Sequence, residues 1–403
     1  MKAIKIKLYP NLEQRDYIGN LLGCTRFIYN NCLSYKIDKY NEDKKTVGFG
    51  ELGRYLTNLK NEHPFLKDVH SKVLQQSLIN LDIAYKNFFK NSMGFPNFKK
   101  KSQKQSCRFP VDAIGNIKGN RITIIQKLKN IHYKTSVRDE KILNNFKDKI
   151  KSATLTKSKS GNYQLSILID IPNDKQLPKT DKVIGIDLGI KDFIVTSDNQ
   201  RFENIKIKRN NQKKLAKLQR RLSKKQNGSN NKNKCRIKLA KYHEKLNNIK
   251  ENYLHQVSNK LINENQVICM EDLNVKGMMK NHNLAKSIQE LSLNRFKTML
   301  EYKSNWYGKD LIQIDRYFPS SKQCNCCGFK NNKLTLKDRS WACPQCKVSH
   351  DRDFNAAINI VNEGIKLFKI KIGLSSPELK PLESTTLVDS LKKEKNVVYG
   401  ICP

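Results

Sequence analysis

The sequence predicts a multidomain chain of mixed architecture, with an α+β part followed by an α/β part. Its 403 residues are enough for two or three domains of ordinary size. Apolar residues recur at helical spacing from about residue 11 to 103, and alternate with polar residues from about 105 to 178. This change of period indicates a helical block inserted into a small antiparallel barrel or sheet, which an N-terminal strand can join. Short apolar strands with carboxylates begin at residue 183 and predict the second part.

The helical block is predicted from two apolar stripes. After Pro10 and Asn11, apolar residues repeat at helical spacing as far as Leu33, and Gln14 stands where a capping box would place it. Such stripes ordinarily form a packed core, so we assign them no further role. The second stripe follows Ser71 and consists of Leu74, Leu78, Leu81, Tyr85 and Phe88.

The composition points to a polyanionic partner. Lys and Arg together number 77 against 37 Asp and Glu, which gives a formal net charge of +40. A surplus of this size argues against an ordinary metabolic enzyme and favours a nucleic-acid partner, with a generic basic surface as the alternative. An AT-rich genome can account for part of the lysine content, but codon bias alone would not leave so few acidic residues.

The positive charge is concentrated in residues 201–250. This stretch has 18 Lys or Arg and two Glu, a local charge of +16, and its leucines recur at helical spacing on both sides of the segment QNGSNN. We expect a hairpin of two basic helices over about residues 205–262, which faces phosphates rather than only solvent. The residues that we expect to contact nucleic acid there are Lys213, Lys214, Lys217, Arg220, Arg221 and Lys224.

Three acidic positions accompany apolar elements. Asp187 lies in the strand VIGIDLG, Glu271 directly follows the strand VICM, and the sequence HDRD opens a helix that continues as FNAAINI. A carboxylate among apolar neighbours is costly unless a cation neutralises it. Each acid alone could be an ordinary cap or turn residue, but in this order the three have the layout of an RNase H-like site.

Carboxylates that are brought together repel one another, so we expect them to bind divalent cations. Two Mg²⁺ ions about 4 Å apart, with Mn²⁺ as an alternative, can activate a water and stabilise the leaving 3′ oxygen of a phosphodiester. The predicted chemistry is hydrolytic strand cleavage. Asp351 and Asp353 both qualify as the third acid, and we choose Asp353, which directly precedes FNAA, to act with Asp187 and Glu271.

Four cysteines have the spacing of a zinc ribbon. Cys324 and Cys327 form one CxxC pair, and after fifteen residues Cys343 and Cys346 form another. Each two-residue gap lets a tight turn point both thiolates at one tetrahedral ion. Four thiolates close the coordination sphere, so we predict one structural Zn²⁺, with Cys326 as a bystander.

We expect a cytoplasmic protein, active at the nucleoid and without a membrane partner. The N-terminal sequence MKAIKIKLYP alternates like a strand rather than a signal peptide, and no apolar run approaches the ~18 residues of a membrane helix. The eleven cysteines therefore indicate metal ligation in a reducing compartment rather than disulfides.

Taken in order, four sets of motifs closely resemble the TnpB (OrfB) family. The members of this family are transposon-encoded proteins, related to type V CRISPR effectors, with a split RuvC-like nuclease domain. The motifs are GIDLGIKDFIVTSD, ICMEDLNVKGM, YFPSSKQCNCCG with WACPQC, and HDRDFNAAINI. The segments LLGCTRFIYNNCL, LQQSLINLDIAYKNFF and GFPNFKKKSQKQSCRF resemble the leading region of the family, so the resemblance covers most of the chain.

The resemblance implies an order of domains. They are a β-barrel wedge domain (1–10 and 104–179), a helical recognition domain (11–103), a RuvC-like nuclease domain (180–319 and 349–373), a zinc ribbon inserted in it (320–348) and a flexible tail (374–403).

The resemblance also implies a function. Such proteins bind a guide RNA transcribed from the transposon end, recognise a short DNA motif beside the target, and cut double-stranded DNA opposite the guide. Carried onto this chain, the nuclease residues are Asp187, Glu271 and Asp353 with Mg²⁺, and we expect one protein chain per RNA. The candidates for contact with the DNA motif, which an ordinary helix start would explain equally well, are Ser71, Lys72 and Gln75.

Two other functions are alternatives. A transposase would join as well as cut DNA and would have to hold both transposon ends, but the sequence shows no dimerisation heptad. An RNA-guided repressor would bind without cutting, and the loss of an acid would mark it, whereas all three acids are present. We therefore favour the endonuclease. Composition and spacing support phosphodiester hydrolysis and a polyanionic partner, while the guide RNA follows from the resemblance alone.

Overall fold

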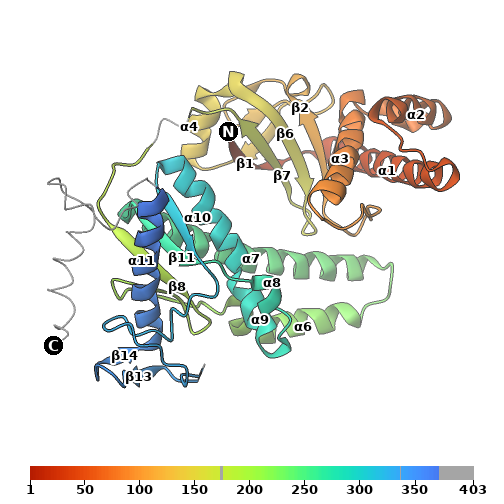
Figure 1. Cartoon of the computed structure of the whole chain (residues 1–403). Helices are drawn as coiled ribbons and strands as arrows, with labels where there is room; N and C mark the ends of the chain where they lie inside the picture. Colours follow the sequence, from red (N-terminus) through yellow and green to blue (C-terminus); the bar gives the residue numbers. More distant parts are fainter. Residues whose placement is uncertain (173–175, 336, 372–403) are drawn as a thin grey trace. The chain divides into compact units, whose positions relative to one another are not determined.

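The computed structural model describes residues 1–172, 176–335 and 337–371, which form two compact units (Figure 1). The first unit comprises Met1–Pro172 and Arg220–Lys241, and the second comprises the other described residues. The tail predicted for residues 374–403 lies outside the described residues. Every helix in these ranges is too short or too polar to span a bilayer.

Two helices of the first unit follow the two predicted stripes, and a third, over residues 49–62, was not predicted. Asn11 and Gln14 exchange hydrogen bonds of 2.8 and 3.0 Å in a complete capping box, which fixes the start of the first helix. The apolar faces of these helices pack into one core with the sheet described next. The helices are α1 (Leu12–Asp43), α2 (Phe49–Glu62) and α3 (Ser71–Lys90), with a 3₁₀ turn at Pro64–Asp68.

The strands of the first unit form one antiparallel sheet. Strand β1 pairs with β7 from Lys2 to Leu8 and with β5 on its other side, so the N-terminal strand joins this sheet as predicted. A short helix, α4 (Val137–Asn145), lies between β5 and β6 in the sequence. The strands, in order across the sheet, are β2 (Gln105–Pro110), β6 (Ile150–Lys157), β7 (Tyr163–Ile169), β1 (Lys2–Tyr9), β5 (Ile131–Lys134), β4 (Arg121–Ile122) and β3 (Ile117–Lys118).

This sheet is open, which is one of the two architectures that the periodicity predicted, whereas the family resemblance implied a β-barrel. In the described ranges, β2 and β3 stand at opposite edges, and no register joins them. The physical reason lies in β3 and β4, which have only two residues each and therefore offer too few backbone groups to close a barrel.

The basic stretch forms two helices, in agreement with its helical leucine spacing. Helices α6 (Gln212–Ser223) and α7 (Asn230–Glu264) are joined by residues 224–229, in which Gly228 has a φ of +79°. On α6 only Leu218 is buried, so nearly all of its surface is available to a partner. A single helical turn, α5 (Ile207–Asn210), precedes them.

The second unit is built on a mixed sheet of five strands. Strands β8, β11 and β12 run parallel to one another, and β9 and β10 continue the sheet in antiparallel fashion. In order across the sheet the strands are β10 (Arg201–Glu203), β9 (Asp192–Thr196), β8 (Val183–Leu188), β11 (Val267–Glu271) and β12 (Asp310–Ile314).

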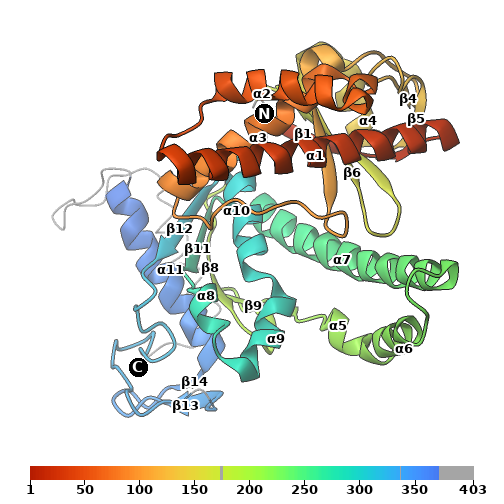
Figure 2. The same cartoon turned by 90° about the vertical axis from the view of Figure 1, so that its right-hand side faces the viewer.

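Helices cover both faces of this sheet, so the second unit has three layers (Figure 2). Ile184 and Ile186 of β8 point into the core that α7 and α10 cover, while Val183 points into the core that α11 covers. This is the alternation expected of a strand that is buried on both sides. The remaining elements are α8 (Val275–Met278), α9 (His282–Leu291), α10 (Leu293–Tyr307), β13 (Ser340–Ala342), β14 (Ser349–Asp351) and α11 (Arg352–Lys371).

Two glycines allow α11 to approach the sheet closely. A Cβ atom at Gly185 of β8 would lie 2.3 Å from the carbonyl oxygen of Ala357 in α11. A Cβ atom at Gly364 of α11 would lie 2.3 Å from Sγ of Cys269 in β11. Both distances are far shorter than van der Waals contact, so a side chain at either position would push the helix away from the strands.

We expect the variant Gly364→Ala to lower the free energy of unfolding by about 1–3 kcal/mol, because the added methyl group overpacks the contact with Cys269. The matched control is Gly19→Ala in α1, where a Cβ atom meets nothing within 4 Å and alanine favours the helix. Denaturant unfolding of the two variants measures both effects. A Gly364→Ala variant as stable as the control would contradict the close approach.

Candidate functional site

Two of the predicted acids lie on the sheet face that α11 covers. Gly185 and Cys269 are register partners in β8 and β11, and both meet α11. Asp187 and Glu271 each follow two residues later along their strands. Because side chains alternate along a strand, both acids share the α11 face and end neighbouring parallel strands.

Asp187 interacts electrostatically with both of the other acids. Burial, together with the negative charges of Glu271 and Asp353, raises the pKa of Asp187 from 3.8 to about 8, although Arg352 acts in the opposite direction. Burial also raises the pKa of Glu271, and a hydrogen bond that the Ser320 hydroxyl donates to Oε1 of Glu271 offsets this in part. The structure thus brings Asp187 within electrostatic reach of both Glu271 and Asp353.

Asp353 belongs to the first turn of α11, and arginines hold its carboxylate. Arg352 donates to Oδ1 at 2.9 Å and Arg339 donates to Oδ2 at 3.3 Å. The Asp353 side chain is only 15% exposed, which favours it as the third acid. In the described residues, the ligand atoms of the three acids do not all lie within 4.8 Å of one another.

Asp351, the other candidate for the third acid, has a different environment. Its Oδ1 accepts a hydrogen bond of 3.0 Å from the backbone N–H of Phe354, which is the contact of a helix N-cap. Its Oδ2 pairs with Arg201 at 3.1 Å, and the side chain is 45% exposed. These contacts assign Asp351 a capping role at the start of α11.

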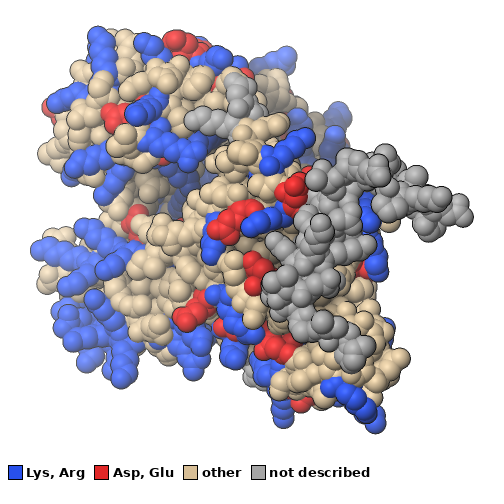
Figure 3. Space-filling model, turned by 90° about the vertical axis from the view of Figure 1, so that its left-hand side faces the viewer, with Lys and Arg blue, Asp and Glu red and all other residues tan. Residues whose placement is uncertain are grey.

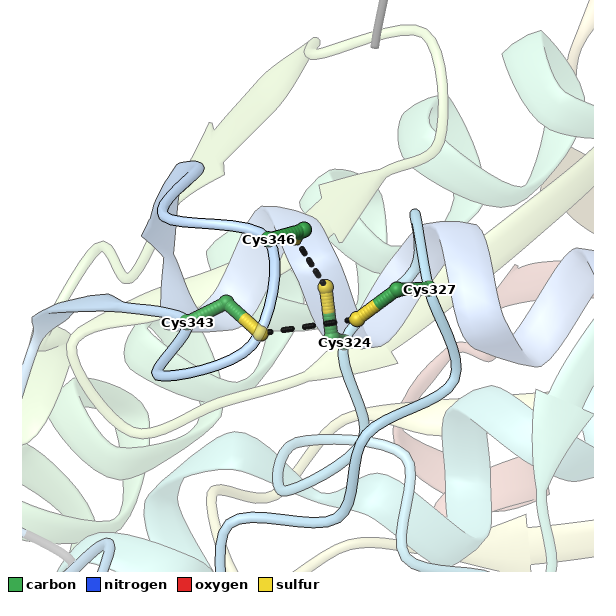
Figure 4. Close-up of side chains that lie close together, drawn as sticks. All are labelled: Cys324, Cys327, Cys343 and Cys346. Carbon is green, nitrogen blue, oxygen red and sulfur yellow. Dashed lines mark hydrogen bonds between the residues drawn. The ribbon is translucent and has the colours of Figure 1, made fainter. Parts of the chain in front are cut away.

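The four predicted cysteines gather into one cluster (Figure 4). The four Sγ atoms all lie within 4.8 Å of one another, with 3.6 Å between Cys324 and Cys346 and 3.5 Å between Cys327 and Cys343. These distances are short enough for the four sulfur atoms to bind a single metal ion.

The backbone around the cysteine cluster has a local repeat. The N–H of Gly328 donates to the Cys324 carbonyl at 3.0 Å, and the N–H of Lys347 donates to the Cys343 carbonyl at 2.9 Å. Both donors have a positive φ, +78° for Gly328 and +62° for Lys347, as the residue after each CxxC pair. The two turns therefore present their thiols in the same way, as two metal-binding knuckles do.

A histidine that the sequence did not single out also meets this cluster. Nε2 of His350 lies 3.1 Å from Sγ of Cys324, and its ring packs against Trp341 with 4.9 Å between centroids. Cys324, Cys326 and His350 form a second group of possible ligands. His350 is the first residue of HDRD and follows Cys346 by four residues, and this proximity was the signal that could have pointed to the contact.

The residues predicted to contact the DNA motif are partly engaged within the first unit. The Ser71 hydroxyl accepts from Nζ of Lys60 at 2.7 Å, and Lys72 pairs with Asp112. Gln75 is exposed. All three side chains are exposed at the start of α3, so their contact with a DNA motif stays a prediction.

A basic pocket lies one turn further along α3. Sequence reasoning missed it, because its walls combine α1, α3 and the segment before and within β2. Polar side chains of α3 contribute Gln76, Ser77 and Asn80. The cations that line the pocket, with no acid among its lining residues, are Arg26, Lys99, Lys100, Lys104 and Arg108.

The six basic residues predicted on the hairpin are all exposed. In the described part of the chain no acidic side chain forms a salt bridge with any of them. Lys and Arg are also more widespread than Asp and Glu on the face shown in Figure 3. These features suit contact with a polyanion. The six residues are Lys213, Lys214, Lys217, Arg220, Arg221 and Lys224.

Comparison with known proteins identifies the family. Residues 166–282 match a family described as "Probable transposase", OrfB of IS605 type. A Streptomyces pristinaespiralis protein named "Putative RNA-guided DNA endonuclease" is 32% identical over 366 residues, which are 90% of this chain and 89% of that protein. The chain belongs to the TnpB family. Escherichia coli K12 InsQ, which has the same descriptive name, is 29% identical over 90% of this chain and 92% of its own length.

Two further segments of this TnpB-family chain match known domains. Residues 294–360 match the TNB domain of Cas12f1-like proteins, and residues 1–45 match a helix-turn-helix domain. In the structure, residues 1–45 form strand β1 and the single long helix α1. A solved Cas12f1 complex with guide RNA and target DNA has a related fold, with a TM-score of 0.55 and 16% identity over 88% of this chain and 83% of that one.

Folding raises the pKa of Asp187, so the folded state binds this proton more tightly than the unfolded state does. The free energy of unfolding should therefore fall as the pH rises from 3.8 toward about 8. In the variant Asp187→Asn, the side chain at this position cannot ionise, so it does not contribute to this pH dependence. Without added divalent cations at pH 7.5, we expect its Tm to exceed that of the wild type by at least about 3 °C, and the difference to shrink toward pH 4.5.

A matched control has the opposite sign. Lys297 and Arg316 hold the pKa of Asp272 below its ordinary value, so Asp272→Asn should lower the Tm at pH 7.5. Differential scanning fluorimetry of both variants separates the two effects. A Tm of Asp187→Asn equal to or below that of the wild type would show that the acids do not repel one another.

Proposed function

We propose that this TnpB-family chain is an RNA-guided DNA endonuclease, encoded by a transposable element, that hydrolyses DNA phosphodiesters at one RuvC-like site. The observation on which the proposal depends is the cluster of Asp187, Glu271 and Asp353 between the sheet and α11. The RNA guide and the DNA substrate are inferred from the names of its relatives, which are described as putative RNA-guided DNA endonucleases.

The three acids would bind two Mg²⁺ ions, with Mn²⁺ as an alternative. The donor set fits such ions, because burial and two neighbouring carboxylates raise the pKa of Asp187, burial raises the pKa of Glu271, and a divalent cation would stabilise both carboxylates in their ionised form. When bound, the ions supply an activated water and stabilisation of the leaving 3′ oxygen. Ser320 orients Glu271, and Arg339 and Arg352 hold Asp353 in place while the cations are absent.

The cysteine cluster would hold one structural Zn²⁺. Four thiolates at mutually short distances satisfy a tetrahedral ion without leaving a position for substrate. We assign residues 320–348 to a zinc ribbon within a RuvC-like domain of residues 180–319 and 349–373. We assign the sheet of the first unit to a wedge domain (1–10 and 104–179) and its helices to a recognition domain (11–103).

The partners that we propose are a guide RNA from the transposon end and double-stranded target DNA, with one protein chain per RNA. The exposed cations of α6 would contact phosphates. The basic pocket beside α3 is a better candidate for DNA contacts than Ser71, Lys72 and Gln75. Because its substrate is DNA, the protein would act at the nucleoid.

A strand-transfer enzyme is the second candidate function, because the matching family is described as a probable transposase. It would use the same three acids but leave DNA ends joined to a new strand. An RNA-guided repressor is less well supported, because it has no need of a cluster of costly acidic residues.

We expect one zinc ion per chain, measured by elemental analysis of protein purified without chelator. Cys343→Ser removes one of the four thiolates and should lose the metal and lower the Tm. Cys326→Ser is the matched control and should keep both. Zinc retained in Cys343→Ser and lost in Cys326→Ser would instead favour the group that contains Cys326 and His350.

Asp353→Ala should slow DNA cleavage by about 10³-fold or more, because it removes a metal ligand, while RNA binding persists. Asp351→Ala is the control at the same helix start. It should retain cleavage and lose about 1 kcal/mol of stability through the lost N-cap. The reverse outcome, with Asp351→Ala inactive and Asp353→Ala active, would exchange the two assignments.

The experiment that tests the function is to express the chain with its native flanking DNA and then replace the guide end of the copurified RNA. Cleavage that follows the new guide and leaves hydrolysed ends is the expected result. Products joined to a second strand would indicate a transposase. Cleavage that is indifferent to the guide would reduce the function to a metal-dependent nuclease with a basic surface.

A further inference from the structure

Two buried asparagines on α11 connect the cysteine cluster to the acids. Asn355 and Asn359 lie one turn apart on the same face of the helix, and are 1% and 4% exposed. Buried amides are costly unless hydrogen-bonded, so their partners indicate why they are present.

All partners of these two amides belong to residues 320–325, the segment that ends in the first metal-binding knuckle. Asn355 donates through Nδ2 to the Gln323 carbonyl at 2.8 Å and accepts at Oδ1 from the Asn325 N–H at 3.0 Å. Asn359 donates through Nδ2 to the carbonyls of Ser320 at 2.8 Å and Gln323 at 2.6 Å. Cys324 lies between Gln323 and Asn325, so the amides hold the backbone on both sides of this thiol.

The other end of the same segment holds an acid. The Ser320 hydroxyl donates to Oε1 of Glu271, while the Ser320 carbonyl accepts from Asn359. A short chain of contacts therefore runs from Cys324 through the backbone to Ser320 and on to Glu271. The helix that anchors this chain also supplies Asp353, two residues before Asn355.

Only an amide satisfies these contacts. Asn359 uses both hydrogens of its Nδ2 for two carbonyls, and Asn355 uses one donor and one acceptor. An apolar side chain would leave buried backbone groups without partners, and an aspartate would place a carboxylate against carbonyl oxygens. An ordinary helix–loop contact would not require this chemistry at two successive turns.

We propose that Asn355 and Asn359 are positioning residues that make the geometry of Glu271 depend on the folded cysteine ribbon. The inference rests on the proposed function for the role of Glu271 as a metal ligand. Because the link runs through Ser320, the affinity of the acid cluster for a divalent cation depends on the hydrogen bonds that Asn355 and Asn359 make with residues 320–325. Partners of this kind typically change metal affinity by 10–100-fold when they are removed.

The test measures Mn²⁺ binding to the full chain by electron paramagnetic resonance, a readout that does not require cleavage. The variants are Asn359→Ala, which removes the amide from the Ser320 carbonyl, and Ser320→Ala, which removes only the hydroxyl from Glu271. The matched control is Asn265→Ala. Asn265 is 5% exposed, and its amide donates to the Leu261 carbonyl at 2.9 Å, directly after α7.

We expect Asn359→Ala and Ser320→Ala each to weaken Mn²⁺ binding by about tenfold, and Asn265→Ala to change it less than twofold. The Mn²⁺ affinity of the double variant of Asn359 and Ser320 should lie within about twofold of the affinity of the more impaired single variant, because both changes act on one path. Zinc content should stay at one ion per chain in all of them, so that the loss is not loss of the ribbon.

Other outcomes overturn the proposal. If Asn359→Ala lowers the Tm as Asn265→Ala does but leaves Mn²⁺ binding unchanged, the amides only fasten the loop. If the two single effects multiply in the double variant, the path through Ser320 is wrong. Failure of the proposed function looks different, because the wild-type chain would then neither bind Mn²⁺ at the acids nor cleave guide-matched DNA.

Discussion

Repulsion between carboxylates is the constraint on which the second unit depends. Packing α11 directly onto β8 and β11 brings Asp353 near Asp187, whose pKa is raised first by the cost of burial and then by the charges of Glu271 and Asp353. The surrounding contacts can be understood as responses to that cost. Two arginines hold Asp353, a serine hydroxyl holds Glu271, and glycines at the helix–sheet contact let the helix pack close to the strands.

Much of this site could be predicted from the sequence because it depends on periods and spacings. The apolar strands VIGID and VICME identified Asp187 and Glu271 as candidates, and two CxxC pairs predicted which thiols meet. The face that the two acids share follows instead from the register of β8 with β11. The choice between Asp351 and Asp353 could not be settled in this way, because both lie at one helix start and only tertiary contacts separate a cap from a site residue. The predicted barrel failed for a similar reason, since closure depends on strand lengths at the edges.

The sequence contains weaker signals of the residues whose roles depend on tertiary packing. Asn355 and Asn359 lie in an apolar helix sequence and look like polar interruptions until their partners in residues 320–325 are known. Likewise, the basic pocket beside α3 depends on how α1 and β2 pack against that helix, although the lysine run at 99–104 hinted at it. A net charge of +40 predicts a polyanion but does not say which surface meets it.

The position of the cysteine ribbon between β12 and α11 has a consequence for protein synthesis. Asp353 follows the ribbon in the chain, whereas the basic helices and the two strand acids precede it. Since chains emerge from the ribosome in order, at about 5–20 residues per second, the nascent protein exposes its basic helices well before Asp353. With the sites proposed above, an unfinished chain would collect RNA while it is still unable to cut, and cleavage would begin only after the ribbon has left the ribosome.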